Sequence, residues 1–291
     1  MPKHLKNFIN VTRLKKPTGY LLLFWPCSWG LSLAYFFQRD IKIFLYYLLL
    51  FFCGSVLMRS AGCIVNDIVD EKIDKKVHRT KNRPIASGVL SKKLAWIYVL
   101  ILCFFAFIIL IQFNFLTIFL GIFSMVFAFT YPFMKRFTYW PQLFLGFTFN
   151  WGIIMAWTSI ENNISYLPIV LYVGAIFWTL GYDTIYGTQD ASDDEIIGVK
   201  STAIRFKKNL HTFVGSCYVI SSILIFFVFM KLEIDYFLIL FLVFVISLFY
   251  QIKIFDPKKP STCLKAFKLN NFSGFIIFLT IFLITAESQW N

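Results

Sequence analysis

Charged residues are scarce in this sequence, because Asp, Glu, Lys and Arg together make up 15% of its 291 residues. So little charge cannot cover the surface of a water-soluble globule of this size. The chain is instead 58% hydrophobic and 20% aromatic, with a mean hydropathy of +0.70. In hydrocarbon the outside of a helix can be as apolar as its inside, so this composition predicts an integral membrane protein.

Patterns typical of disulfide frameworks and zinc sites are also missing. The six cysteines include no C-x-x-C pair, and the three histidines lie far apart. The first 18 residues are polar and basic and lead directly into an apolar stretch, so we expect no cleavable signal peptide. A transit peptide would be longer and richer in Ser and Arg, which favours a bacterial inner membrane over an organelle.

Stretches of about 20 mostly apolar residues, the length that crosses a bilayer, occur nine times. They cover 19–37, 42–64, 94–112, 115–134, 141–159, 165–182, 211–230, 235–252 and 270–287. The sequence therefore predicts an all-α polytopic fold, with nine transmembrane helices around a central cavity that opens to the cytoplasmic side. We expect residues 1–291 to form a single integral-membrane domain.

The positive-inside rule supports this count. With the N-terminus in the cytoplasm, 25 of the 28 Lys and Arg residues fall on the inner side, and the outer side keeps only Arg39, Lys42 and Lys231. Adding or removing one span would move whole basic clusters across the membrane. The pattern predicts a cytoplasmic N-terminus and a periplasmic C-terminus. Because the basic residues are clustered between spans, the net charge of +13 does not indicate binding to nucleic acid.

Acidic residues are fewer still, and nine of the 15 fall in two short stretches after the second and sixth spans. These nine are Asp67, Asp70, Glu71, Asp74, Asp183, Asp190, Asp193, Asp194 and Glu195. Carboxylates near membrane depth are costly and mark functional sites by default. The alternative is that these stretches are solvated acidic loops that balance basic neighbours. Two such stretches on the same side of the membrane argue against it. We expect two functional loops, at 66–93 and 183–208.

The first stretch suits a hard metal ion. If the second span continues as a helix, Asn66, Asp70 and Asp74 share one face at spacings of four residues. Like charges on one face repel, and a cation relieves the repulsion. Oxygen ligands from Asn and Asp favour Mg²⁺.

The second stretch repeats this geometry. Asp183, Gly187, Asp190 and Asp194 lie at steps of four, three and four residues, which predicts one helical stripe. Mg²⁺ usually binds one or two carboxylates together with substrate phosphates. Two such stripes facing one cavity, with Lys and Arg nearby, therefore predict a diphosphate site.

Basic side chains that could neutralise a diphosphate come from the same face of the membrane. They include Arg59, Arg79, Lys81, Arg83, Lys135, Arg136, Lys200 and Arg205. Most are expected to be topology signals. Arg59 stands out because it lies among apolar residues, and Lys135-Arg136 because their predicted loop is very short.

At these residues the sequence resembles the membrane-embedded aromatic prenyltransferases, and within them the members that act on 4-hydroxybenzoate in ubiquinone synthesis. The resemblance rests on Asn66-Asp67-x-x-Asp70-x-x-x-Asp74, Arg79-Thr80-Lys81-Asn82-Arg83-Pro84-Ile85-Ala86-Ser87-Gly88, Tyr131-Pro132-Phe133-Met134-Lys135-Arg136, Tyr182-Asp183 through Asp190-x-x-x-Asp194, Gly198-Val199-Lys200-Ser201-Thr202-Ala203 and the opening Arg13-Leu14-Lys15-Lys16-Pro17-Thr18-Gly19. It covers nearly the whole chain and implies a nine-helix fold.

The resemblance implies a reaction between a polyprenyl diphosphate and 4-hydroxybenzoate. Mg²⁺ held by Asn66, Asp70, Asp74, Asp190 and Asp194 would bridge the donor diphosphate, with Arg79 and Lys200 among its basic partners. Arg59, Lys135 and Arg136 remain alternatives for the acceptor carboxylate. Asp67 or Asp183 would orient or deprotonate the phenol. The isoprenoid tail would lie between helices and open to membrane lipid.

Three alternative functions are compatible with parts of this pattern. Another aromatic acceptor would leave the chemistry unchanged. A phosphotransferase acting on CDP-alcohols would need Asp-Gly-x-x-Ala-Arg where this chain has Asp70-Glu71-Lys72-Ile73. A cation transporter would place its carboxylates near the midplane on broken helices, whereas here they follow the cytoplasmic ends of spans.

Overall fold

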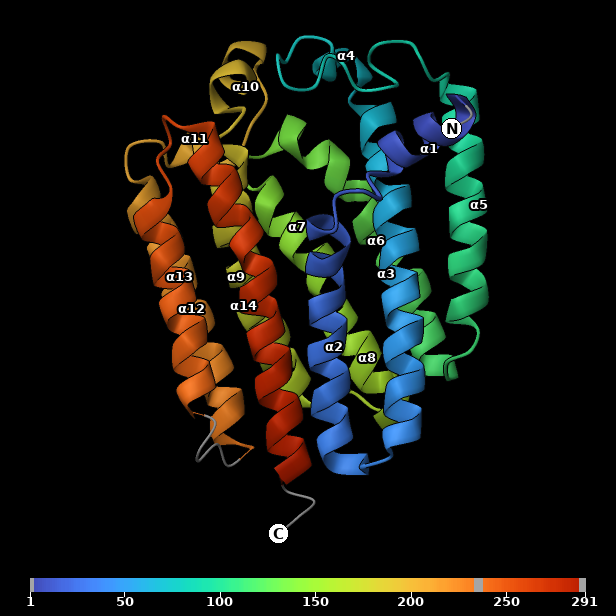
Figure 1. Cartoon of the computed structure of the whole chain (residues 1–291), viewed down its shortest axis with the longest axis vertical. Coiled ribbons are helices and arrows are strands. Elements are labelled where there is room, and N and C mark those ends of the chain that lie inside the picture. The colour runs from blue at the N-terminus through green and yellow to red at the C-terminus, as the bar shows by residue number, and fades with distance from the viewer. Residues whose placement is uncertain (1–2, 233–237, 288–291) are drawn as a thin grey trace.

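The computed structural model describes residues 3–232 and 238–287, and within them the regular structure is helical. The helices are α1 (Lys3–Thr12), α2 (Thr18–Gln38), α3 (Ile41–Val69), α4 (Glu71–Asp74), α5 (Lys92–Leu110), α6 (Phe115–Phe137), α7 (Pro141–Asn150), α8 (Gly152–Glu161), α9 (Tyr166–Gly187), α10 (Ala191–Ile197), α11 (Thr202–Arg205), α12 (Leu210–Met230), α13 (Leu238–Ile254) and α14 (Pro260–Glu287). The long helices run roughly along one axis and form a bundle (Figure 1).

The spanning helices confirm the prediction of a polytopic membrane fold. Among the described residues, eight segments are long and apolar enough to cross a membrane, and α7 with α8 counts as one of them. The shorter apolar helix α13 corresponds to the predicted stretch 235–252, whose first three residues lie outside the described part of the chain. Together these nine segments follow the nine predicted stretches in order.

Two helices extend past the predicted limits on the side that carries the acidic residues. Helix α3 runs to Val69, beyond the predicted end at 64, and α14 begins at Pro260, well before 270. A hydropathy pattern ends where polar residues begin, but helical hydrogen bonding does not need apolar side chains. The extension of α3 carries Asn66 and Asp67 on its last turn.

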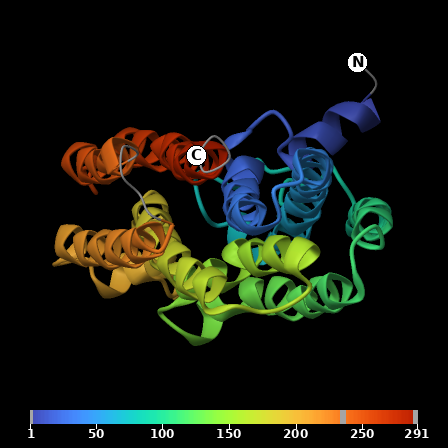
Figure 2. The same cartoon turned by 90° about the horizontal axis from the view of Figure 1, so that it is seen from below.

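Helix α2 lies in the middle of the bundle, next to α3, α8 and α14 (Figure 2). Two glycines allow a close approach of α2 and α8. A Cβ atom on Gly30 would lie 2.2 Å from the carbonyl oxygen of Ile153, and one on Gly152 would lie 2.3 Å from the Cys27 sulfur. Small residues at such contacts are a common solution for packing in membranes, where burial of apolar surface between helices is not a driving force.

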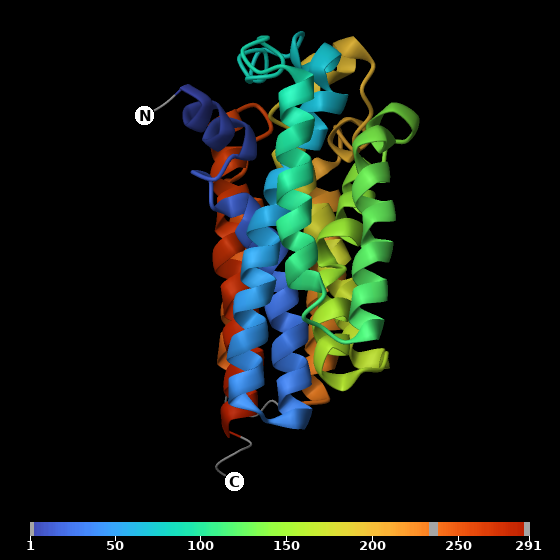
Figure 3. The same ribbon diagram turned by 90° about the vertical axis from the view of Figure 1, so that its right-hand side faces the viewer.

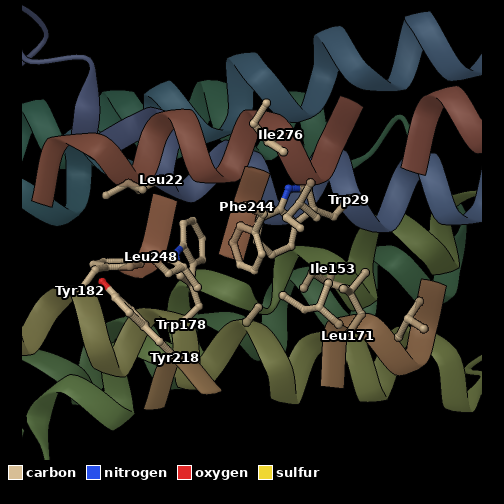
Figure 4. Close-up of a cluster of buried hydrophobic side chains, with 14 of the residues drawn as sticks. Leu22, Trp29, Ile153, Leu171, Trp178, Tyr182, Tyr218, Phe244, Leu248 and Ile276 are labelled. Atoms are coloured by element: carbon tan, nitrogen blue, oxygen red, sulfur yellow. The ribbon is translucent and has the colours of Figure 1, made fainter. Parts of the chain in front are cut away.

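The main core fills the space between α2, α9, α12, α13 and α14, and Figure 4 shows part of it. Two buried indoles combine packing with hydrogen bonds between helices. Trp29 Nε1 donates to the carbonyl oxygen of Gly274 at 2.8 Å, and Trp178 Nε1 donates to Asn270 Oδ1 at 2.8 Å. These bonds tie α2 and α9 to α14.

Both acidic stretches lie at the same end of the bundle, with α4 and α10, and α1 packs beside α3 and α5 at that end (Figures 1 and 3). Helix α14 ends at the opposite end (Figure 1). The fold thus brings together two groups of carboxylates that are more than a hundred residues apart in the sequence.

Candidate functional site

The first acidic stretch keeps the helical spacing predicted from the sequence. Helix α3 ends at Val69 and α4 follows after Asp70, whose backbone N–H donates to the carbonyl oxygen of Asn66 at 2.9 Å. The N–H of Asp74 in turn donates to the carbonyl oxygen of Asp70 at 2.7 Å. The steps of four residues therefore persist across the junction. Asp67, Asp70 and Asp74 are all buried.

Two arginines from different parts of the chain neutralise Asp67 and Asp74. Arg13, which follows α1 in a left-handed backbone conformation, donates through Nη2 to Asp67 Oδ1 at 2.5 Å. Arg83 donates through Nη1 to Asp67 Oδ1 at 3.1 Å and to Asp74 Oδ2 at 2.9 Å. Buried carboxylates need such partners, because an unpaired charge is very costly there. Both arginines lie in conspicuous sequence motifs, but nothing in the sequence pairs them with these carboxylates.

Asp70 faces the end of α6. Lys135 donates to Asp70 Oδ2, and Arg136 approaches Oδ1 only to 3.9 Å while donating to the carbonyl oxygen of Val69 at 2.8 Å. Burial raises the pKa of Asp70, and Lys135 opposes that rise. The predicted loop after the fourth span is the last turn of α6, so both cations also lie where the helix dipole favours positive charge. Asp70 Oδ1 is buried and accepts no hydrogen bond.

The second acidic stretch does not form the single helical stripe that its spacing predicts. Helix α9 ends at Gly187, and a turn of three residues, the last of which is Asp190, leads into α10. The fork of Arg79 donates through Nε to Asp190 Oδ1 at 2.7 Å and through Nη2 to Oδ2. Arg79 also donates to the hydroxyl of Tyr186 at 3.4 Å. Tyr186 was not singled out in the sequence, because a tyrosine in an apolar helix gives no signal of its own.

The loop after α4 and helix α10 are further joined by the backbone N–H of His78, which donates to Asp193 Oδ2 at 3.1 Å. Desolvation by burial, with a like charge from Asp190, raises the pKa of Asp194 to about 6. Lys135 and Arg79 act on Asp194 in the opposite direction. Lys135 therefore interacts with carboxylates of both stretches, which meet around it.

Below this charged end lies an apolar cavity of about 440 Å³ between α2, α3, α5, α6, α7 and α8. Arg59, Asn66 and Tyr131 line its charged end, and Phe51 and Phe113 line the far end. Helices α5 and α6, which form one wall, lie at the periphery of the bundle (Figure 2). This wall faces the side where lipid would lie.

Arg59 is the basic residue of this cavity. It stands over the ring of Phe149, with 5.3 Å between the guanidinium carbon and the ring centroid. Its Nε is buried and makes no hydrogen bond. Asp183 and Tyr131 interact with it electrostatically. Of the predicted basic site residues, Arg59 alone lines this cavity, whereas Lys200 Nζ donates to the carbonyl oxygen of Phe137 at 3.2 Å.

The carboxylates suit a hard divalent cation by their chemistry, since every predicted ligand donates oxygen. In residues 3–232 and 238–287, no three His, Cys, Asp or Glu side chains stand close enough together to hold a metal between them. Basic side chains lie between the acidic ones instead. The buried Asp70 Oδ1, which has no hydrogen-bond donor, is the atom best placed to accept a cation. The residues present therefore fit Mg²⁺, with some rearrangement of the Arg and Lys partners.

An all-helical membrane bundle with two acidic motifs above an apolar cavity defines a class of enzymes that transfer apolar groups within the bilayer. Residues 23–279 match the UbiA prenyltransferase family, and the chain belongs to this family. It is 38% identical over 282 residues to the 4-hydroxybenzoate octaprenyltransferase of Blochmanniella pennsylvanica, with 96% of each chain covered.

Longer eukaryotic relatives are matched only in part. The chain is 44% identical over 210 residues to the mitochondrial 4-hydroxybenzoate polyprenyltransferase of Arabidopsis thaliana, which covers 72% of this chain and 51% of that protein. Among solved structures, a UbiA homolog from Aeropyrum pernix K1 superposes with a TM-score of 0.75 at 20% identity, covering 90% and 97% of the two chains. A UbiA homolog from Archaeoglobus fulgidus bound to GPP and Mg²⁺ gives 0.68 at 15% identity, covering 96% and 99%. At such identities the likeness concerns the fold.

Proposed function

We propose that this protein transfers a polyprenyl group from polyprenyl diphosphate to the ring of 4-hydroxybenzoate, ortho to the hydroxyl, giving 3-polyprenyl-4-hydroxybenzoate and diphosphate. This is a step of ubiquinone biosynthesis. The names of relatives that cover nearly the whole chain support this acceptor. We further propose that the acidic end faces the cytoplasm of a bacterial cell, so that the N-terminus lies inside and the C-terminus in the periplasm.

One structural observation carries the proposal: two groups of carboxylates meet around Lys135 directly above an apolar cavity. A polar head with a long apolar tail fits this arrangement, with the diphosphate at the charged end and the isoprenoid chain among α3, α5 and α6. A transported cation would gain no binding energy from a long apolar cavity. The arrangement thus favours transfer of a prenyl group over cation transport.

On the donor side, Asn66, Asp70, Asp74, Asp190 and Asp194 would hold Mg²⁺. When bound, Mg²⁺ neutralises the charge that the diphosphate gains as its bond to the allylic carbon breaks. Arg79 and Lys135 contribute further positive charge to the leaving group. The aromatic walls of the cavity exclude water, which would otherwise capture the allylic cation.

On the acceptor side, Arg59 is the residue we assign to the carboxylate of 4-hydroxybenzoate. Lys135 is already paired with Asp70, and Arg136 lies half exposed at the surface. Arg59 lines the cavity, and its Nε makes no hydrogen bond. A guanidinium in an apolar surrounding binds a carboxylate strongly.

Asp183 is the better of the two candidate bases. Asp67 is already engaged, because Arg13 and Arg83 both pair with its Oδ1. Asp183, on the last turns of α9, interacts mainly with Arg59. In our proposal Asp183 accepts the phenol proton, and the electron-rich ring carbon forms the new C–C bond to the allylic carbon as the bond from that carbon to the diphosphate oxygen breaks. The ring hydrogen then leaves as a proton to solvent or the diphosphate, and Asp183 returns its proton to the phenolate oxygen.

The experiment is transfer of labelled 4-hydroxybenzoate into a lipid-extractable product, in membranes that contain the expressed protein and an added polyprenyl diphosphate. We expect product with Mg²⁺ and none with EDTA. D70N and D190N should each abolish transfer, whereas D256N, which changes a carboxylate in the loop between α13 and α14, should not. Near-normal turnover by both site variants would contradict the diphosphate site. Absence of product with every donor length tested would redirect the search to other aromatic acceptors.

A further inference from the structure

A second cavity, which we call the rim pocket, lies at the acidic end of the bundle outside the apolar cavity. It measures about 480 Å³ and is formed by the ends of α3 and α6, the beginning of α5, α4, and the end of α10. It shares no lining residue with the apolar cavity described above. The last turns of α3 and α6 separate the two.

The walls of the rim pocket carry an excess of positive charge. Four cations line it, namely Lys72, Lys92, Lys135 and Arg136, against the single carboxylate of Glu71. Glu71 is shared between Lys92, at 2.5 Å, and Lys75 outside the pocket, at 2.8 Å. Glu71 thus cannot neutralise the whole set.

Two of these cations have spare capacity for an anion. Lys72 takes part in no ion pair in the described part of the chain, and its side chain is exposed. Arg136 donates to the carbonyl oxygen of Val69 and stays 3.9 Å from the nearest oxygen of Asp70, so most of its five N–H donors are uncommitted. Their charge is therefore available to a ligand in the pocket.

The remaining surface of the pocket is aliphatic. Ile68, Ile73 and Ile197 line it beside the cations, and Ile196, next to the pocket on α10, is 85% exposed. A free inorganic anion gains nothing from such surface. An anion that carries an apolar chain matches both parts, and the ends of membrane spans are where lipid headgroups lie.

We propose that the rim pocket binds the phosphate group of an anionic membrane phospholipid. Phosphate is the group that clusters of Lys and Arg at the membrane surface recognise, and the aliphatic side chains accommodate the adjoining glycerol and acyl carbons. The pocket borders the proposed diphosphate site at Lys135, but binding of a lipid phosphate there does not require the proposed reaction. It does share Lys135 with Asp70, so a bound phosphate would compete with Asp70 for that cation.

The test measures lipid preference of the purified full-length protein in nanodiscs, with EDTA present so that no metal can attract phosphate to the acidic stretches. Spin-labelled phosphatidylglycerol and phosphatidylcholine serve as probes, and the ratio of their association constants is the readout. We expect a preference for phosphatidylglycerol in the wild type. The double variant K72A/K92A should reduce that ratio by roughly fivefold for each lysine.

The matched control is K75A/K207A, which removes two exposed lysines paired with glutamates at the same end of the molecule but outside the pocket. An unchanged ratio in K72A/K92A, or an equal loss in the control, would overturn the proposal. A second arm measures binding of inorganic diphosphate in phosphatidylcholine nanodiscs. Binding of diphosphate that depends on Lys72 and Lys92, without any lipid preference, would overturn the lipid as the ligand and leave a site for soluble phosphates.

Discussion

At the scale of single residues, ion pairs between distant segments define the charged end of the molecule. Asp67 pairs with Arg13 and Arg83, Asp70 with Lys135, and Asp190 with Arg79. Breaking a buried pair is far more costly than forming it is favourable, because one charge is left without a partner. These side chains are therefore held in defined positions at the acidic end of the bundle.

Arg59 provides a test at this scale. R59M should raise KM for 4-hydroxybenzoate at least tenfold, since loss of a charged hydrogen bond costs about 1.5–3 kcal/mol. KM for the prenyl donor should change much less. Steady-state kinetics with each substrate varied in turn provide the measurement.

The control for R59M is R205M, which removes a cation that stands over Tyr139 and does not line the cavity. R205M should leave both KM values within about twofold, as surface changes usually have small effects. A rise in KM for the donor alone in R59M would instead assign Arg59 to the diphosphate.

The sequence predicts which residue types gather at the site but not how they pair. Acidic motifs identify Asp70 and Asp190 because carboxylates near membrane depth are rare. The partners Arg13 and Arg83 look like any other topology signal, since a pairing over 54 or 16 residues depends on tertiary structure. The left-handed conformation of Arg13, which directs its side chain toward Asp67, likewise has no local sequence signature.

At the scale of elements, α3 forms one side of the apolar cavity and carries two positions where a larger side chain has room. Gly54 and Gly62 both line the cavity, and a Cβ on either would meet no atom within 4 Å. They lie eight residues apart, which is about 12 Å along a helix. Gly62 is one turn from Asn66 at the charged end, and Gly54 lies deeper.

A large side chain at either glycine should therefore change which lengths of prenyl donor the protein accepts. G54F should retain transfer from a short allylic diphosphate such as geranyl diphosphate but lose at least tenfold in kcat/KM with long donors. G62F should reduce transfer from both. A donor series with each variant is the measurement, and equal losses with short and long donors in G54F would contradict the placement of the chain along α3.

Helix packing gives a second prediction for elements. G30A should destabilise the protein by about 1–3 kcal/mol, because the added methyl group would overlap the backbone of Ile153 and force α2 and α8 apart. In G215A the nearest atom to the new methyl group is 3.9 Å away, so that variant should be neutral or slightly stabilising. Thermal unfolding in detergent compares them, and equal midpoints would show that the α2–α8 contact is looser than the structure indicates.

The sequence predicts which helices exist better than it predicts where each one ends. The apolar pattern predicts α3 but ends five residues too early, since it does not detect a helix that continues through Asn66 and Asp67. The spacing of the second acidic stretch predicts one helical stripe, yet α9 stops at Gly187 and a turn follows. A regular spacing of four and three residues is compatible with a helix but does not require one.

At the scale of the whole molecule, the acidic stretches follow the second and sixth apolar segments, whereas the α8–α9 loop follows the fifth. In the proposed topology, the acidic end and this loop therefore lie on opposite sides of the membrane. Single cysteines in a cysteine-free background can report this. I164C should react with an impermeant maleimide added to intact cells, whereas S87C should react only after the membrane is permeabilised. The reverse pattern would contradict the proposed orientation and leave the fold unchanged.

The overall fold is the level at which the sequence is most informative. Nine apolar stretches and the partition of Lys and Arg predict a polytopic helical protein, because a bilayer leaves few other solutions for a backbone that must satisfy its own hydrogen bonds. The order of the helices around the cavity depends on close contacts such as that of Gly30 with Ile153. No hydropathy pattern contains that information.

The ion pairs at the acidic end have a consequence for assembly. Because each paired carboxylate already has an internal counter-ion, no metal is needed to offset its charge in the folded bundle. Under the proposed function, a carboxylate that now pairs with arginine or lysine would hold Mg²⁺, and the pairing cation would become free. We expect the freed cation to bind the diphosphate of the donor. The same side chain would then neutralise a carboxylate in the resting protein and the substrate during turnover.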